Sequence, residues 1–203
     1  AAEQWCGAAR GAVNAVFISF GNGIEAGLLI EGRTVRGASG RAGAIGWLAL
    51  SETFREEYAE WGTLAVEAGR RSLVRRTIEL WTGSGDSTVG LLSVSNPADL
   101  SPEVVLRAAR AGDQLAVKVV SDLCTWLGRA VADVISTLNP EIVVIGGVLG
   151  RALRPFYGDL RREARKWAEP TAGRQCRIVG ADLGDKSALI GAARLAFEAK
   201  PDK

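Results

Sequence analysis

The most regular pattern of apolar positions in the chain runs from Asp113 to Leu138. Apolar side chains recur there every three or four residues, the period of one face of an α-helix: Ala116, Val120, Leu123, Leu127, Val131, Val134 and Leu138. At about 1.5 Å per residue this segment predicts a helix roughly 39 Å long. The pair Asn139-Pro140 ends it. We expect this long helix to lie in the core.

Other apolar runs are short and rich in β-formers, which indicates strands. The continuous run Ile142–Ile145 is typical of a strand buried on both faces. Val13–Phe20 predicts an earlier strand, followed by a tight turn over the glycine-rich stretch Phe20–Gly27. Two short strands, Leu28–Ile30 and Thr34–Arg36, flank a hairpin loop. The beginning of the chain is therefore predicted to form an antiparallel three-stranded meander.

The rest of the chain alternates helical patterns with irregular stretches. Serine, proline and glutamate at Ser101-Pro102-Glu103 mark a helix start. Further helical patterns occupy Ala1–Ala9, Leu64–Trp81, Leu153–Trp167 and Ser187–Glu198, with a last short strand at Arg177–Gly180. Irregular segments are expected at Gly37–Leu50 and Thr82–Asn96, and Ser51–Trp61 has no clear pattern. This order predicts an α/β fold with helices flanking a sheet.

Composition narrows the possible chemistry. The 203 residues contain no histidine and no methionine, and their net charge is +2. The lack of histidine excludes an imidazole base, a Ser-His or Cys-His pair and a His-ligated zinc. The near-neutral balance argues against nucleic-acid binding by this segment itself. Because a natural chain begins with methionine, we expect Ala1 to be a processed end or, as we favour, the start of an excised fragment.

The cysteines and apolar runs bear on the cellular compartment. Cys6, Cys124 and Cys176 are widely spaced and form no CxxC pair, so we expect buried free thiols in a reducing compartment. No apolar run approaches the roughly 20 residues that a membrane helix needs, and no signal-peptide pattern opens the chain. We therefore expect a soluble, cytoplasmic protein with no membrane partner.

Four stretches in order resemble the C-terminal lobe of the ROK family: FGNGIEAG, GASGRAGAIGW, LNPEIVVIGGVLG and ALIGAARLA. That family contains bacterial repressors, uncharacterised reading frames and sugar kinases of the actin-like ATPase (ribonuclease H-like) fold. The resemblance implies that residues 1–203 form one such lobe, with an antiparallel strand meander, a long central helix and flanking helices. It also implies that the N-terminal lobe, the catalytic aspartate of the kinases and any winged helix-turn-helix are absent from this chain.

Two glycine-rich segments resemble the nucleotide-binding motifs of the family. Gly21, Asn22, Gly23 and Glu25 stand in the stretch that resembles the phosphate loop, where backbone N–H groups can hold phosphate oxygens. Glu25 replaces a glycine of the family pattern, so we expect its negative charge to weaken nucleotide binding. The alternative is a plain turn between strands. Gly146 and Gly147 resemble the motif on the adenosine side, and a simple strand-to-helix turn is again the alternative.

The resemblance also places a sugar-binding signature, read as Gly43-Ala44-Ile45-Gly46-Trp47 in this chain. Ala44 stands where the family has a sugar-binding glutamate, and Trp47 stands where it has a histidine that contacts sugar and zinc. A further sugar-contacting glutamate is replaced by Ala65. Trp47 can stack on a ligand ring or simply pack into the core.

The stretch that resembles the family's zinc loop has lost its metal ligands. Its three cysteine positions carry Glu56, Tyr58 and Thr63, so we expect no structural zinc. The acidic residues Glu56, Glu57 and Glu60 can bind a hard cation or form a solvated acidic face, and we favour the latter. For the arginines Arg70, Arg71, Arg75 and Arg76, with acids such as Glu67 interspersed, we favour a solvated face over a dimer interface or a phosphate contact.

Together these replacements favour a regulator over a kinase. We expect the effector-binding and dimerisation lobe of a ROK-type transcriptional regulator with a degenerate sugar site. It would have no catalytic residue in this chain, no cofactor and no metal, and its effector would be a sugar or sugar phosphate. It would form a homodimer and contact DNA only through a missing N-terminal part. The alternatives are a divergent sugar kinase and a ligand-free scaffold whose site is filled by Trp47.

Overall fold

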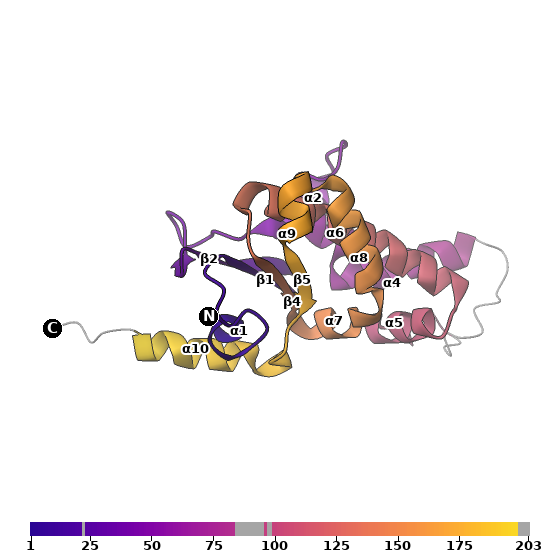
Figure 1. The fold of residues 1–203 in the computed structure, drawn as a ribbon. Coiled ribbons are helices and arrows are strands. Elements are labelled where there is room, and N and C mark those ends of the chain that lie inside the picture. Colours follow the sequence, from indigo (N-terminus) through magenta and orange to yellow (C-terminus); the bar gives the residue numbers. More distant parts are fainter. Residues whose placement is uncertain (22, 84–95, 97–98, 199–203) are drawn as a thin grey trace.

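A five-stranded mixed sheet forms the centre of the molecule (Figure 1). The structure is a computed structural model and describes residues 1–21, 23–83, 96 and 99–198. The strand order is β3-β2-β1-β4-β5, and the strands are β1 Ala15–Phe20, β2 Ile24–Ile30, β3 Arg33–Val35, β4 Ile142–Gly146 and β5 Arg177–Gly180. The first three strands pair antiparallel, while β4 runs parallel to β1 and to β5. The predicted meander and the α/β class are confirmed.

The turn between β1 and β2 is shorter than the sequence predicts. Phe20 pairs with Ile24 and Ser19 pairs with Glu25, so Glu25 belongs to a strand and not to a turn. The glycines of Phe20–Gly27 predict one long turn, but buried Ile24 and Ala26 alternate with exposed Glu25 and Gly27 as strand residues do. Asn22 lies outside the described residues.

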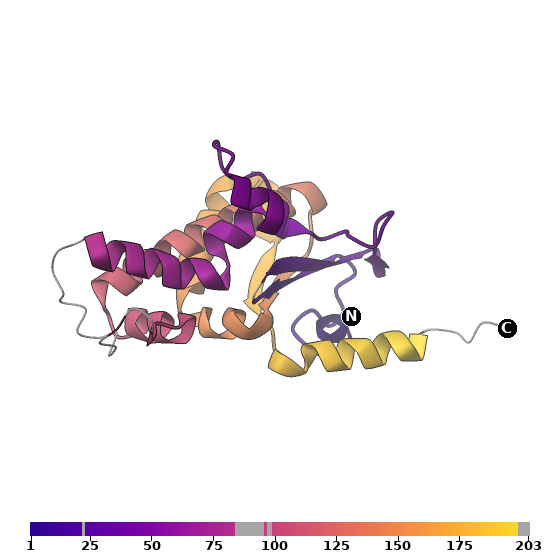
Figure 2. The same cartoon turned by 180° about the vertical axis from the view of Figure 1, so that it is seen from behind.

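Helices cover both faces of the sheet. Figures 1 and 2 show α1 (Ala2–Cys6) and α10 (Ser187–Glu198) along one side, with the larger helical layer on the other. That layer is built around the long helix α6, Gln114–Leu138, which begins and ends within a residue of its predicted bounds. The remaining helices are α2 Glu56–Trp61, α3 Thr63–Ala68, α4 Arg70–Gly83, α5 Pro102–Arg110, α7 Gly147–Ala152, α8 Tyr157–Trp167 and α9 Pro170–Gln175. None of the helices in the described part is long and apolar enough to cross a membrane.

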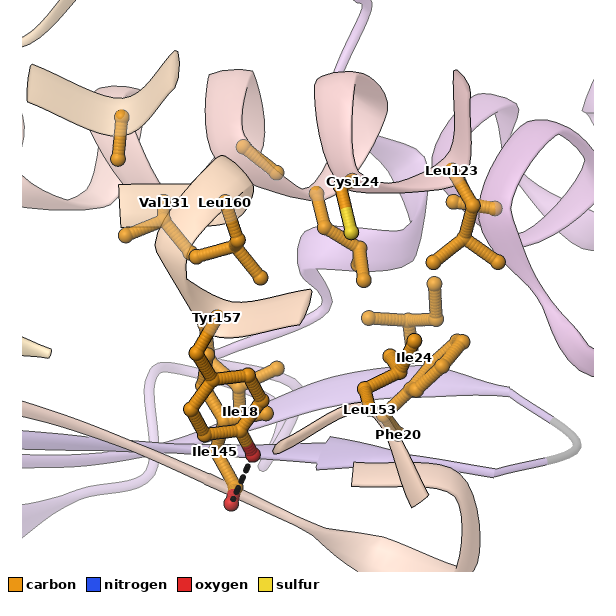
Figure 3. Close-up of a cluster of buried hydrophobic side chains, with 14 of the residues drawn as sticks. Ile18, Phe20, Ile24, Leu123, Cys124, Val131, Ile145, Leu153, Tyr157 and Leu160 are labelled. Atoms are coloured by element: carbon orange, nitrogen blue, oxygen red, sulfur yellow. Dashed lines mark hydrogen bonds between the residues drawn. The ribbon is translucent and has the colours of Figure 1, made fainter. Parts of the chain in front are cut away.

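The main core lies between the sheet and helices α6 and α8 (Figure 3). Strand β4 is buried throughout, with Val143 and Ile145 in this core and Ile142 and Val144 in a smaller cluster on the opposite face. The prediction of a strand buried on both faces is confirmed. The hydroxyl of Tyr157 donates to the Gly150 carbonyl at 2.8 Å and also lies within hydrogen-bond distance, 3.3 Å, of the Ile145 carbonyl, the contact drawn in Figure 3. Burial raises the pKa of Tyr157 to about 12.

Several details depart from the sequence predictions. The apolar patterns predict neither α7 nor α9, and the helix predicted over Leu153–Trp167 begins only at Tyr157. The single helix expected over Leu64–Trp81 is two helices that break at Gly69, where the Ser72 hydroxyl donates to the Gly69 carbonyl at 2.8 Å. The unassigned stretch Ser51–Trp61 contains α2. Of the three free cysteines only Cys124 and Cys176 are buried, because Cys6 lies at the exposed end of a short helix. Most of the loop expected over Thr82–Asn96 lies outside the described residues.

Candidate functional site

The two glycine-rich motifs meet at one edge of the sheet. Strands β1 and β4 are parallel with Ser19 opposite Gly146, so the segments that follow them emerge side by side. Gly147 has a φ of +80°, and a Cβ there would lie 2.4 Å from the Phe20 carbonyl oxygen. The close approach therefore needs glycine at this position. Gly21 and Gly23 lie at the same edge, joined by a hydrogen bond from the Gly21 N–H to the Gly23 carbonyl.

The segment that resembles the sugar signature packs against the start of β2. The Ala26 N–H donates to the Gly43 carbonyl at 2.7 Å, and residues Ile45–Trp47 form a short 3-10 helix, η1. Gly62, between α2 and α3, has a φ of +82°, and a Cβ there would lie 2.4 Å from the Gly46 carbonyl oxygen and 2.9 Å from the Trp47 ring. Strand β2, η1 and the joint between α2 and α3 thus form one packed unit.

A pocket of about 420 Å³ opens beside this unit. It is lined by Glu25, Ala26, Ser39, Gly40, Arg41, Ala42, Gly43, Ala44 and Trp47. Trp47 is 52% exposed, which contradicts both the alternative of core packing and a site filled by its indole. The structure therefore brings Glu25, Ala44 and Trp47 together around one hollow. Ala65 is not part of the lining and lies behind η1, near Gly46.

A cluster of charged side chains around α3 lies where the sequence indicated a solvated face. The carboxylate of Glu67, on α3, is only 6% exposed. It accepts hydrogen bonds from the Tyr58 hydroxyl at 2.6 Å and from the guanidinium groups of Arg55 and Arg76. The expectation that Glu67 forms part of a solvated face is wrong, because these three donors compensate the cost of burying a carboxylate.

The balance of interactions lowers the pKa of Glu67. Burial alone would raise it, but the hydrogen bonds from Tyr58 and Arg76 and the charges of Arg55 and Arg76 outweigh that effect. Burial and the hydrogen bond to Glu67 raise the pKa of Tyr58 in turn. No sequence pattern predicted this cluster, because its members come from separate helices and from the segment before α2.

The residues of the zinc-like stretch are not arranged as metal ligands. A carboxylate oxygen of Glu57 lies 2.9 Å from a guanidinium nitrogen of Arg55 and 3.4 Å from one of Arg75. The Glu57 carboxylate is therefore paired with arginines. Across the described ranges, no three or more histidine, cysteine, aspartate or glutamate side chains are grouped to hold a metal ion. Tyr58, at a position that carries cysteine in the family pattern, is buried and hydrogen-bonded to Glu67.

A larger hollow, about 640 Å³, lies away from these motifs on α4 and the start of α5. Its arginines are engaged with neighbouring residues. Arg70 lies 3.1 Å from Glu103, Arg75 lies 3.4 Å from Glu57, and the Arg71 guanidinium stacks 4.8 Å from the centre of the Trp61 ring. The arginine-rich face of α4 is thus a network of local pairs, and the candidate ligand site is the pocket beside Trp47.

Comparisons with known proteins bear on both the fold and the site. A model of the ROK family matches residues 1–199. A glucokinase of Halalkalibacterium halodurans is 29% identical over 191 residues, covering 93% of this chain and 58% of the relative. A putative xylose repressor of Caldicellulosiruptor sp. is 26% identical over 195 residues, covering 93% of this chain and 47% of the repressor. The chain therefore spans about half the length of these curated relatives.

Solved structures show the same division between regulators and kinases. A ROK family transcriptional regulator, a homologue of the E. coli MLC protein, matches 95% of this chain and 48% of its own, with a TM-score of 0.83 and 27% identity. A glucokinase from Streptomyces griseus, solved with glucose and AMPPNP, matches 98% of this chain and 65% of its own with a TM-score of 0.80 and 24% identity. The actin-like ATPase fold that the resemblance implied is confirmed.

Proposed function

The chain belongs to the ROK family, and from that premise we propose that it is the effector-binding and dimerisation lobe of a transcriptional regulator. Repressors and sugar kinases both occur among its relatives, so the choice rests on the pocket. Of the described residues that line it, Glu25 alone carries a carboxylate, and it lies on β2 next to the turn that resembles the phosphate loop. Ala44 offers no group to orient a hydroxyl.

This arrangement favours ligand binding over phosphoryl transfer. A kinase needs groups that position the acceptor hydroxyl, and it needs positive charge or backbone donors around the transferred phosphate. A carboxylate at Glu25 repels that phosphate. An open pocket with an aromatic wall and several polar groups is sufficient for a sensor, and its volume lies within the usual range for small-molecule sites.

The regulator would act by linkage between its lobes. A sugar or sugar phosphate that favours one arrangement of the lobes would change the spacing of paired DNA-binding heads in a homodimer. The DNA contact would come from residues outside this chain. Light scattering of the full-length protein is expected to give a dimer at high concentration, and a monomer would contradict this part of the proposal.

A thermal-shift screen of the full-length protein tests the proposal. A ligand at 100 times its Kd adds about 2.7 kcal/mol, or several degrees in Tm for a domain of this size. We expect a shift with a sugar or sugar phosphate and none with ATP. ATP-dependent phosphorylation of a hexose would overturn the proposal in favour of a divergent sugar kinase, which the juxtaposed glycine motifs at β1 and β4 support. No shift with any ligand would favour a scaffold.

A further inference from the structure

The pocket beside Trp47 is lined by two side chains of opposite charge that form no ion pair with each other. Glu25 and Arg41 both line it, and no ion pair joins them. Within the described residues, the side chains of four lining residues form no hydrogen bond with another side chain or backbone group. These groups are the Glu25 carboxylate, the Arg41 guanidinium, the Ser39 hydroxyl and the Trp47 indole N–H. Four polar groups around one hollow are therefore available to a ligand.

The backbone holds these groups in place before any ligand arrives. Glu25 is fixed by its pairing with Ser19, and its neighbour Ala26 is buried against the core. The loop that carries Ser39 and Arg41 is tied down at its C-terminal side, where the Ala42 N–H donates to the Arg36 carbonyl at 3.1 Å and the Ala26 N–H donates to Gly43 at 2.7 Å. A site with a fixed backbone loses less entropy on binding.

Each wall of the pocket has a preferred chemistry. The Arg41 guanidinium presents a planar fork of donors that suits a carboxylate or a phosphate. The Glu25 carboxylate suits an ammonium group, and the exposed face of Trp47 attracts cations and the apolar face of a ring. An anion without an amine is repelled by Glu25, and an amine without an acid is repelled by Arg41.

We infer that the ligand is a small zwitterion, with an ammonium group paired to Glu25 and an acidic group paired to Arg41, on a scaffold that rests against Trp47. A ligand of this kind neutralises both charges, whereas a neutral sugar leaves both unmatched. The inference rests on the proposed function, since it names the class of effector for the same pocket. The same chemistry is found in amino sugars that carry an acid and in amino acids, and the indole face favours the ring.

Four ligands that share one ring separate the contribution of each charge. Calorimetry with the full-length protein at about pH 6, where amines are protonated, compares glucose, glucosamine, glucose 6-phosphate and glucosamine 6-phosphate. Each matched charge in an exposed pocket is worth about fivefold in Kd, so glucosamine 6-phosphate is expected to bind at least fivefold more tightly than each of the others. Glutamine, an amine and an acid without a ring, is the fifth ligand.

Substitutions assign each charge to its residue. Glu25→Gln is expected to weaken glucosamine 6-phosphate about fivefold and to leave glucose 6-phosphate unchanged or tighter. Arg41→Gln is expected to weaken both phosphates about fivefold and to spare glucosamine. Glu52→Gln and Arg36→Gln, which remove exposed charges outside the pocket lining, serve as matched controls and should change no Kd.

The outcomes separate this inference from the proposed function. Equal binding of all four sugars would overturn the zwitterion and leave a sugar-binding regulator intact. Binding of none of the five ligands, while another sugar shifts the Tm, would likewise overturn only the zwitterion. If glutamine binds as tightly as glucosamine 6-phosphate, the charge pairing is supported and the ring contact with Trp47 is overturned. Phosphorylation of a bound sugar by ATP would overturn the proposed function itself.

Discussion

Trp47 and Glu67 occupy environments that their residue types alone do not predict. An indole usually buries most of its surface and a carboxylate usually stays in water, yet Trp47 is half exposed and Glu67 is buried. The resemblance drew attention to Trp47 as a site residue, and the structure places it in the pocket wall. The sequence predicts a solvated position for Glu67, because nothing in the local sequence shows that Tyr58 and two arginines converge on it.

Replacing Glu67 by glutamine should lower the free energy of unfolding by about 2–3 kcal/mol. The change leaves Arg76, which is largely buried, without its main ionic partner, and breaking a buried pair costs more than the pair itself contributes. Urea denaturation measures the difference. Glu57→Gln, which removes an exposed carboxylate paired with Arg55 and Arg75, should cost less than about 1 kcal/mol. Equal effects would contradict a special role for Glu67.

The lowered pKa of Glu67 gives its contribution a defined pH range. In the folded state the pKa lies below its ordinary value of 4.5, so the ionised carboxylate stabilises the fold. That contribution is complete above the unfolded pKa and is lost as the pH falls through the folded pKa. The stability difference between the wild type and Glu67→Gln should therefore be constant above about pH 5 and shrink below it. If the stability difference between the two proteins grew as the pH falls, the lowered pKa of Glu67 would be contradicted.

At the scale of elements, the long helix α6 and the strands around it were the easiest to predict. The helix shows seven apolar positions in register over its whole length, and the Asp113 side chain accepts the Ala116 N–H at 2.9 Å as its N-cap. Short helices were not predictable in the same way. Helices α2, α3 and α9 have six residues each, too few for a period to show, and their positions depend on contacts with distant segments.

The joint between α2 and α3 is expected to be intolerant of any side chain at Gly62. In Gly62→Ala the new methyl group would meet the Gly46 carbonyl oxygen and the Trp47 ring, so we expect a lower Tm together with a change in tryptophan fluorescence. A residue other than glycine at this backbone conformation costs about 1–3 kcal/mol. Gly11→Ala is the control, because Gly11 shares the positive φ, at +83°, but has open space around it. If the two variants lose the same amount of Tm, backbone strain accounts for the effect and the contacts of the new methyl group do not.

At the scale of the whole molecule, one buried carboxylate joins the two ends of the described chain. Glu3, on α1, accepts hydrogen bonds from the N–H groups of Ala8, Asp182 and Leu183 and from the Ser187 hydroxyl. This closure and the packing of α10 beside α1 in Figures 1 and 2 could not be predicted from the sequence. A glutamate in a short helix gives no sign of partners about 180 positions away.

Removing this carboxylate should loosen α1 and α10 selectively. Glu3→Ala leaves four donors without their acceptor, and an unsatisfied buried donor costs about 1–3 kcal/mol. Hydrogen–deuterium exchange is expected to accelerate in both terminal helices and to stay unchanged in α6. Glu52→Ala, at an exposed position, should leave the exchange pattern as it is. Faster exchange throughout the molecule would show instead that the terminal helices unfold only together with the core.

The parallel pairing of β1 with β4 has a consequence for synthesis on the ribosome. Asn14 and Glu141, which directly precede the two strands, are hydrogen-bonded although they are 127 positions apart in the sequence. At a translation speed of about 5–20 residues per second, β1 waits roughly 6–25 s for its partner. During that time the edge of β1 at which Ala15–Ser19 later pair with β4 is unpaired, and an unpaired strand edge promotes aggregation. The nascent chain is therefore expected to be most prone to aggregation in the interval before β4 emerges.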